Sequence, residues 1–355
     1  MSLSNTLPVP SFYSAEKVGE VYRVDYEAVA RQAREDAARY GIQPAASDQF
    51  RTCLLLIDVQ NTFCIPGFEL FVPGAVADNQ RLVTFLYRNL PHITQIAVTL
   101  DTHRAVQIFH APFWIRGTGP VSQPAFDVPE GAHPRPNTII TADEVRRGAW
   151  RVNPAVAGSL GWPSDLLQRH ALHYVERLEQ QGRFALTIWP YHAMLGGIGH
   201  ALVSAVEEAV FYHTVARDSQ ADFQLKGENP LTENYSALGP EVMEGPDGLD
   251  IGAGRNSAFL EKLLQFDAVI IAGQAKSHCV AWTVADLLAE IQKRDPALAR
   301  RVYLLEDCCS PVVIPGVVDF TESANEAFRR FAEAGMHRVR SDQPLSQWPG
   351  LPKDA

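Results

Sequence analysis

The sequence predicts a three-layer α/β protein with a doubly wound parallel sheet of about six strands. Short apolar runs rich in β-branched residues are typical of parallel strands buried on both faces. They occur at residues 53–57, 93–100, 184–189, 268–272 and 302–305. Segments with helical spacing alternate with these runs, as in βαβ units. The predicted helices cover residues 78–89, 199–213, 257–264, 278–292 and 321–334.

Some segments lie outside this alternation. Residues 1–50 carry one predicted helix, at 25–39, and we expect them to form an N-terminal helical extension. Residues 115–183 begin rich in proline and glycine and lack several alternating strands, so an insertion is favoured over an independent domain. We therefore expect one domain over residues 51–340, with an insertion at about 115–183, and a C-terminal tail at 341–355.

Charge and composition restrict the expected partners. The 355 residues include 31 Lys and Arg against 41 Asp and Glu, a formal net charge of −10. An acidic surface repels nucleic-acid backbone and anionic lipid, so we expect neither nucleic acid nor a membrane as partner. No apolar run approaches the roughly 18 to 20 residues of a membrane span, and no secretion signal is recognisable at the start. A cytoplasmic location is the expectation.

Acids and histidines follow the predicted strands, where ligands bind in doubly wound sheets. Asp58 closes the first apolar run, in LLLIDVQNTFC, and burying an acid there is costly unless it has a partner or a catalytic role. Asp101 and His103 lie two residues apart, a spacing suited to chelating one ion. His110 follows, and His192 ends the motif WPYH. Together these residues suit Zn(II) or Fe(II). Capping of a helix or turn explains a lone Asp-x-His pair more often than a metal does, and the added WPYH motif is what favours the metal.

Cys279 is the candidate nucleophile. It begins a predicted helix directly after a buried strand, in VIIAGQAKSHCV, where the helix dipole is expected to lower the pKa of a thiol. Lys226 precedes a glycine in DFQLKG. The chain has five cysteines, an odd number without a secretion signal, so a disulfide framework is not expected. Cys53, Cys308 and Cys309 are interpreted as small buried residues.

Five motifs occur in order along the chain: IDVQNTFC, DTH, WPYH, LKG followed by NYSAL, and GQAKSHCV. Together they resemble the cysteine amidohydrolases of the isochorismatase-like superfamily, and within it the nicotinamidase/pyrazinamidase group most closely. The resemblance covers residues 53–290 and implies the Rossmann-like, isochorismatase-like hydrolase fold. It matches Asp58, Lys226 and Cys279 to the catalytic triad of the family. It matches Asp101, His103 and His192 to the metal ligands.

The same resemblance implies further site residues. His110 matches an additional histidine near the metal, and Phe63 and Trp189 match aromatic walls that would hold a flat ring. A cis peptide is implied at Gln274-Ala275, with an oxyanion hole formed by the amides of Ala275 and Cys279. The implied cofactor is a divalent metal, zinc first, with iron or manganese as alternatives. A homo-oligomer is also implied, with residues 1–50 as a candidate interface.

The implied function is hydrolysis of a small aromatic primary amide, such as nicotinamide, through a Cys279 thioester. Cleavage of a carbamoyl or ureido carbon-nitrogen bond is the alternative, because relatives with the same triad catalyse it, although the retained metal ligands favour nicotinamide. A non-catalytic binding or scaffold protein is less favoured, because such a chain need not keep the triad. Thr62, AMLGGIGHAL and QAKSH depart from the usual nicotinamidase pattern, so the substrate stays open.

Overall fold

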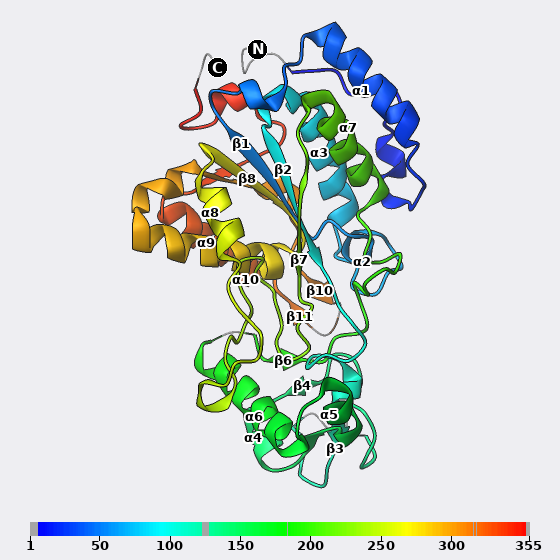
Figure 1. Ribbon diagram of the computed structural model, residues 1–355, viewed down its shortest axis with the longest axis vertical. Coiled ribbons are helices and arrows are strands. Elements are labelled where there is room, and N and C mark those ends of the chain that lie inside the picture. The colour runs from blue at the N-terminus through cyan, green and yellow to red at the C-terminus, as the bar shows by residue number, and fades with distance from the viewer. Residues whose placement is uncertain (1–5, 123–127, 183, 315, 317, 353–355) are drawn as a thin grey trace.

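A six-stranded parallel sheet forms the centre of the protein (Figure 1). The computed structural model describes residues 6–122, 128–182, 184–314, 316 and 318–352. The strand order is β12-β9-β8-β1-β2-β7, and all neighbouring pairs are parallel. The strands are β1 (Thr52–Ile57), β2 (Gln95–Asp101), β7 (Asp222–Lys226), β8 (Ala268–Gly273), β9 (Val302–Leu305) and β12 (His337–Val339). The predicted doubly wound α/β class is confirmed.

Helices cover both faces of the sheet (Figure 1). Those on one face are α1 (Tyr26–Tyr40), α3 (Ala75–Arg88) and α7 (Ser204–Arg217), and those on the other are α8 (Ser257–Leu264), α9 (Ala281–Arg294) and α10 (Thr321–Glu333). Side chains alternate across a strand, so Leu54 and Leu56 of β1 join the first core whereas Leu55 and Ile57 join the second. The continuous burial of β1 explains why it reads as an unbroken apolar run.

The topology creates a switch point between β1 and β8. From β1 the chain passes outward to β2 and β7, and then returns to the other side of β1 to form β8. Connections on opposite sides leave a crevice at the carboxyl ends of these two strands. Asp58 follows β1 and Cys279 follows β8, so the fold places both residues at this crevice.

One strand prediction is wrong. The run 184–189 does not enter the central sheet; only β6 (Leu186–Thr187) forms there, and it pairs with β4 (Ile139–Ile140) in a separate ribbon. The run is apolar because Leu186 and Ile188 belong to the core of the inserted segment.

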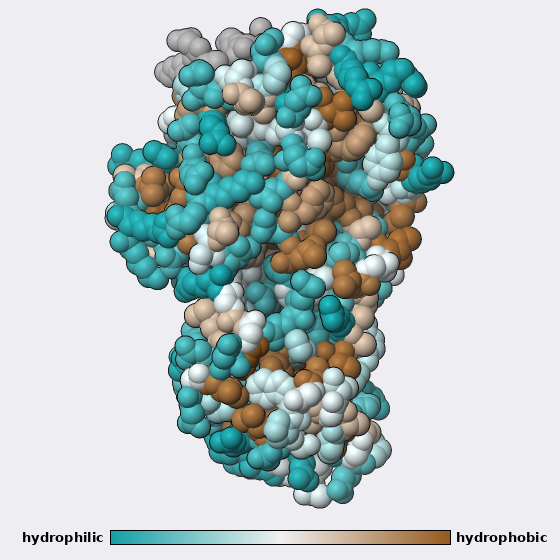
Figure 2. All heavy atoms as spheres, in the orientation of Figure 1, coloured by the Kyte–Doolittle hydropathy of each residue, from teal (hydrophilic) through white to brown (hydrophobic). Residues whose placement is uncertain are grey.

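Two strands of the central sheet were not predicted, β7 and β12. β7 is an edge strand whose Phe223 and Leu225 are exposed, so its sequence lacks a continuous apolar run. Figure 2 shows apolar side chains along the surface where this edge lies. β12 has only three residues, which is too short for a recognisable pattern.

The inserted segment forms a lobe beyond the carboxyl end of the sheet (Figure 1). Its elements are β3 (Trp114–Arg116), β4, α4 (Ala142–Arg146), β5 (Trp150–Val152), α5 (Pro154–Leu160), α6 (Ser164–Gln180) and β6. This lobe has a hydrophobic core of its own, centred on buried residues such as Trp114, Trp150 and Tyr174. Leu231 and Val242, from the long loop after β7, complete that core and tie the lobe to the sheet body.

The N-terminal extension packs on its own chain. Helix α1 lies against α7, and the Tyr212 hydroxyl donates a hydrogen bond to the Asp36 carboxylate at 2.8 Å. Val29 and Ala33 of α1 join the core on that face of the sheet. None of the helices in the described part of the chain combines the length and apolarity needed to cross a bilayer.

Gly273 ends β8 at a position that admits only glycine. Its φ is +123°, and a Cβ atom there would lie 2.0 Å from the carbonyl oxygen of Ile57. We expect Gly273→Ala to lower the free energy of unfolding by about 3 kcal/mol or more, because steric overlap adds to backbone strain. The control is Gly161→Ala, where φ is +70° and no atom lies within 4 Å; strain alone should cost about 1 kcal/mol. Urea titration followed by circular dichroism measures both, and equal losses would contradict the steric argument.

Candidate active site

The candidate triad residues meet at the switch point. Lys226 Nζ lies 2.9 Å from Asp58 Oδ2 and 3.7 Å from Cys279 Sγ. All three side chains are buried. Asp58 is fixed from behind by Thr99, whose hydroxyl donates a 2.6 Å hydrogen bond to Oδ1. The ends of β1 and β7 and the helical turn after β8 therefore bring together a thiol, a carboxyl group and an ammonium group.

Burial controls the protonation of this group. It raises the pKa of the Cys279 thiol well above its usual range, and the Lys226 ammonium only partly opposes this. Burial also raises the pKa of Asp58, again opposed by Lys226. The lowered thiol pKa expected from a helix start is therefore wrong for the resting protein. Cys279 lies in a π-helical turn, Lys276–Val280, directly before α9. The loss of hydration on burial raises the thiol pKa more than the positive charge of Lys226 lowers it.

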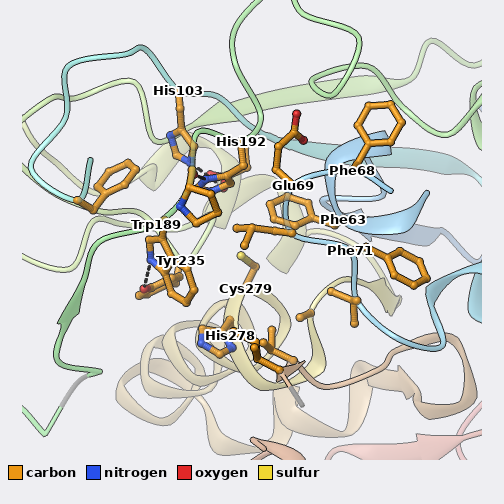
Figure 3. A pocket seen from close by; sticks show the side chains of 18 of the residues that line it. Phe63, Phe68, Glu69, Phe71, His103, Trp189, His192, Tyr235, His278 and Cys279 are labelled. Atoms are coloured by element: carbon orange, nitrogen blue, oxygen red, sulfur yellow. Dashed lines mark hydrogen bonds and ion pairs between the residues drawn. The ribbon is translucent and has the colours of Figure 1, made fainter. Parts of the chain in front are cut away.

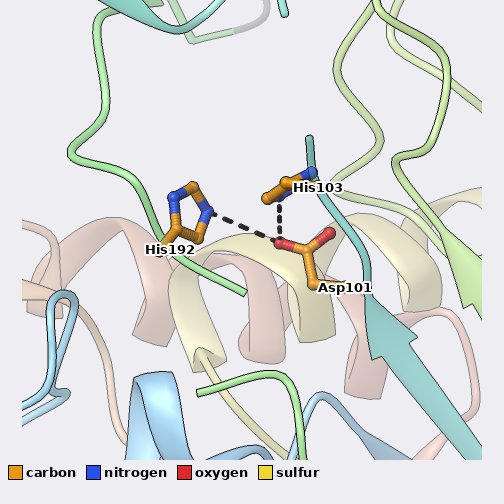
Figure 4. A group of neighbouring side chains, drawn as sticks. All are labelled: Asp101, His103 and His192. Carbon is orange, nitrogen blue, oxygen red and sulfur yellow. Dashed lines mark hydrogen bonds and ion pairs between the residues drawn. The ribbon is translucent and has the colours of Figure 1, made fainter. Parts of the chain in front are cut away.

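The candidate metal ligands form a compact buried cluster (Figure 4). Asp101 Oδ2 lies 2.9 Å from His103 Nε2 and 3.7 Å from His192 Nε2. One potential ligand atom from each residue lies within 4.8 Å of the other two. The second oxygen of Asp101 accepts a 2.8 Å hydrogen bond from Lys226 Nζ. Although burial opposes it, His103 and Lys226 hold the pKa of Asp101 well below its usual range.

The backbone orients both imidazole rings for ligation. Nδ1 of His103 lies 3.2 Å from the carbonyl oxygen of Gly227, and Nδ1 of His192 lies 2.8 Å from that of Pro190. These contacts turn both Nε2 atoms toward Asp101, as backbone carbonyls bonded to the other ring nitrogen do in metal sites. Gly227 leaves room for this cluster, since a Cβ atom there would lie 2.7 Å from His103 Cε1. The donor set fits a divalent ion such as Zn(II).

His110 adjoins this cluster without joining it. Its ring centroid lies 5.9 Å from those of both His103 and His192. Nδ1 faces the carbonyl oxygen of Arg104 at 3.0 Å, whereas Nε2 is buried without a hydrogen-bond partner. Burial is the main cause that lowers the pKa of His110 to about 3, so the ring is neutral at pH 7.

A cavity of about 420 Å³ opens beside Cys279. Phe63 and Trp189, the predicted aromatic walls, both line it. Figure 3 shows Cys279 between Trp189 and Tyr235 on one side and Phe63 and Phe71 on the other. The metal cluster borders the same cavity through Asp101, His103 and His192. The thiol and the metal ligands therefore face one space that is large enough for a single-ring molecule.

The loop that carries the nucleophile contains the implied cis peptide at Gln274-Ala275. The side-chain amide nitrogen of Gln274, Nε2, donates a 2.9 Å hydrogen bond to the Asp78 carboxylate. The Lys276 backbone N–H donates a 2.8 Å hydrogen bond to the backbone carbonyl of Ser310. Ala275 lines the cavity together with Cys279. The two residues of the implied oxyanion hole thus border the same space.

Several cavity residues were missed by the sequence interpretation. Tyr235 lies in the NYSAL motif and His278 directly precedes Cys279, so neighbouring motifs signalled both. Glu233 and Phe109 also line the cavity, and neither belongs to a motif. An acid in a polar loop and a phenylalanine in an apolar segment are common on surfaces and in cores, so local sequence carried no signal for them.

The chain is similar to several solved structures at low sequence identity. No family model and no curated protein matches the chain. The nicotinamidase/pyrazinamidase of Acinetobacter baumanii is 18% identical, over 83% of this chain and 98% of that chain, with a TM-score of 0.47. The yeast nicotinamidase Pnc1p is 18% identical, over 81% and 99%, with a TM-score of 0.49. The N-carbamoylsarcosine amidase of Thermoplasma acidophilum is 15% identical, over 83% and 98%, with a TM-score of 0.39.

Proposed function

We propose that this protein is a cysteine amidohydrolase that converts a small aromatic primary amide, such as nicotinamide, to the carboxylic acid and ammonia. One observation supports the proposal above all. The Asp58 carboxyl group and the Cys279 thiol both lie within 3.7 Å of the Lys226 ammonium nitrogen, beside a cavity with aromatic walls. A nucleophile, a proton acceptor and a fixed cation are the parts that acyl transfer requires.

The first half of the reaction forms a thioester. Asp58 takes the proton of the Cys279 thiol while the sulfur attacks the amide carbonyl carbon, so a carbon-sulfur bond forms as the carbonyl oxygen gains negative charge. The backbone amides of Ala275 and Cys279 are placed to stabilise this oxyanion. Lys226 stabilises the ionised forms of both Asp58 and Cys279. Asp58 then passes the proton to the amide nitrogen, the carbon-nitrogen bond breaks, and ammonia leaves.

The second half hydrolyses the thioester. Asp58 accepts a proton from water as the water oxygen attacks the thioester carbon. The carbon-sulfur bond breaks, the carboxylic acid is released, and the sulfur recovers its proton from Asp58. One amide and one water give one acid and one ammonia, and the protein returns to its starting state. Asp58 carries the proton in both halves, which requires it to be ionised before each attack.

Asp101, His103 and His192 would hold a divalent metal ion at the wall of the cavity. When bound, the ion supplies a Lewis acid that can position a ring nitrogen of the substrate. Lys226 forms ion pairs with both Asp101 and Asp58, so it links the candidate metal ligands to the candidate triad. The aromatic walls favour a flat ring over a linear ureido compound. Carbamoyl and ureido substrates are therefore the second candidates in the test below.

Removal of the nucleophile tests the reaction class. We expect Cys279→Ala to lower kcat for carboxamide hydrolysis by about 10⁴-fold or more, because no other group can form the thioester. Ammonia release from a panel of aromatic carboxamides and ureido compounds measures this. Cys53→Ala is the matched control, since Cys53 is a buried cysteine of β1 outside the cavity. Equal rates in Cys279→Ala and wild type would reject the mechanism, and hydrolysis of ureido compounds alone would favour the second candidate.

The pH profile tests the role of Asp58. Burial raises the pKa of this carboxyl group above its ordinary value of about 3.9. A protonated Asp58 cannot accept the thiol proton, so kcat/KM should fall as the pH drops through this raised pKa. Initial rates between pH 4 and pH 8, with circular dichroism to verify folding, measure the profile. Activity that stays constant down to pH 4, or that survives in Asp58→Asn, would contradict this assignment.

Metal analysis tests the ligand set separately. We expect His192→Ala to reduce bound zinc to below about a tenth of the wild-type amount after dialysis against a weak chelator, because one of three protein ligands is lost. Inductively coupled plasma mass spectrometry measures metal per chain without reference to activity. His200→Ala is the control, since His200 contacts Thr102 nearby but lies outside the cluster. Unchanged zinc in His192→Ala would remove this residue from the metal site.

A further inference from the structure

Glu233 is a buried acid in the cavity wall that the reaction above does not use. It lies in the loop after β7, lines the cavity, and is only 4% exposed. Its Oε1 atom accepts hydrogen bonds from the Tyr235 hydroxyl at 2.9 Å and from Trp189 Nε1 at 3.2 Å. Its Oε2 atom accepts one from the Tyr174 hydroxyl at 2.8 Å. The carboxyl group is thus held rigidly by three neutral donors.

In the described part of the chain no salt bridge holds this carboxyl group, and the only charge interaction that lowers its pKa comes from His103. Within the residues that the structure describes, Glu233 forms no ion pair with a lysine, arginine or histidine. Burial raises its pKa to about 7, in spite of the three hydrogen bonds. A buried carboxylate normally has a cationic partner or takes up a proton. With a pKa of about 7, Glu233 is partly ionised at neutral pH, and a nearby cation would favour its ionised form.

The surrounding groups match the ionised form of Glu233. Trp189 Nε1 can only donate, and the Tyr174 hydroxyl already accepts a 3.1 Å bond from the Glu233 backbone N–H. A carboxylate offers about four acceptor positions, of which these contacts occupy three. Within the described chain, the second acceptor position of Oε2 receives no hydrogen bond. The three donors stabilise the ionised carboxylate of Glu233, and an ionised carboxylate attracts a positively charged ligand.

The catalytic centre forms no ion pair with Glu233. Asp58 and Asp101 share the single positive charge of Lys226. A divalent ion would leave this set with one net positive charge, and transfer of the Cys279 proton to Asp58 would not change that sum. Glu233 stands apart from this balance, since its hydrogen bonds go to Tyr174, Trp189 and Tyr235.

The inserted lobe builds this feature. Tyr174 lies on α6, in the lobe core, and is fully buried. Its hydroxyl holds both the backbone N–H and the carboxylate of Glu233, which lies 59 residues further along the chain. The lobe thereby fixes the acid next to Trp189 and Tyr235, whose side chains lie side by side in Figure 3. An acid beside two electron-rich rings is the chemistry that recognises organic cations.

We propose that Glu233 is a specificity-determining residue that pairs with a positively charged nitrogen of the amide substrate, next to Trp189 and Tyr235. The inference rests on the proposed amidase function and narrows its substrate class to cationic aromatic amides. The ammonium group occupies the free acceptor position of Glu233, and the carbonyl group faces Cys279.

A matched pair of substrates tests the proposal. 3-(Aminomethyl)benzamide is an ammonium ion at pH 7, and 3-(hydroxymethyl)benzamide is its neutral counterpart of similar shape. We expect wild type to prefer the ammonium compound at least tenfold in kcat/KM, and Glu233→Gln to reduce this ratio to about one. Glu69→Gln is the control, because Glu69 is an exposed acid that lines the same cavity, and it should keep the wild-type ratio.

Further measurements separate this proposal from a structural role and from the proposed reaction. Tyr174→Phe keeps the charge but removes one donor, so it should retain the preference even if Glu233→Gln does not fold. Calorimetry with Cys279→Ala measures binding without turnover. A tenfold binding preference without hydrolysis would support the inference and reject the amidase function. Equal kcat/KM for both amides, an equal loss for both in Glu233→Gln, or no binding of either compound would overturn the inference.

Discussion

The buried ammonium group of Lys226 is the interaction on which the site depends. It lies 2.9 Å from Asp58 and 2.8 Å from Asp101, two carboxylates that would otherwise repel one another in a buried environment. Removing one partner from a buried charge cluster typically costs about 3 to 5 kcal/mol, because the remaining charges lose their compensation. Lys226 ends β7, the edge strand of the sheet. The edge of the fold is therefore held to its centre by the same contacts that assemble the triad.

The doubly wound sheet and the inserted lobe contribute different parts of the cavity. The carboxyl ends of β1, β2 and β7 supply the charged groups and the segment after β8 supplies the thiol. Their positions follow from the parallel register of the strands. The lobe supplies Trp189 and, through Tyr174, the position of Glu233. In the proposed reaction the strand ends supply the reacting groups, and the lobe supplies part of the wall against which the substrate would bind.

The elements most accurately predicted are those buried on both faces. β1 and β8 are buried throughout, so their sequences show unbroken apolar runs. β7 was not predicted because alternate residues are exposed at the sheet edge. The run at 184–189 was wrongly predicted as a strand of the central sheet because it is apolar for a different reason, which is that it packs in the lobe core. The candidate site residues were predictable because each follows a strand or lies in a motif. Glu233 follows β7 as well, but in a polar loop without a distinguishing spacing.

The sequence by itself determined the α/β class, four of the six central strands and the residue types available for chemistry, because periodicity and strand-end motifs are local properties of the chain. Tertiary structure alone decided the protonation of Cys279 and the environment of Glu233. Burial raises the pKa of both groups, and the depth of burial depends on segments far away in the sequence. The hydroxyl that holds Glu233 comes from Tyr174, and no local pattern encodes a contact between two separately folded segments.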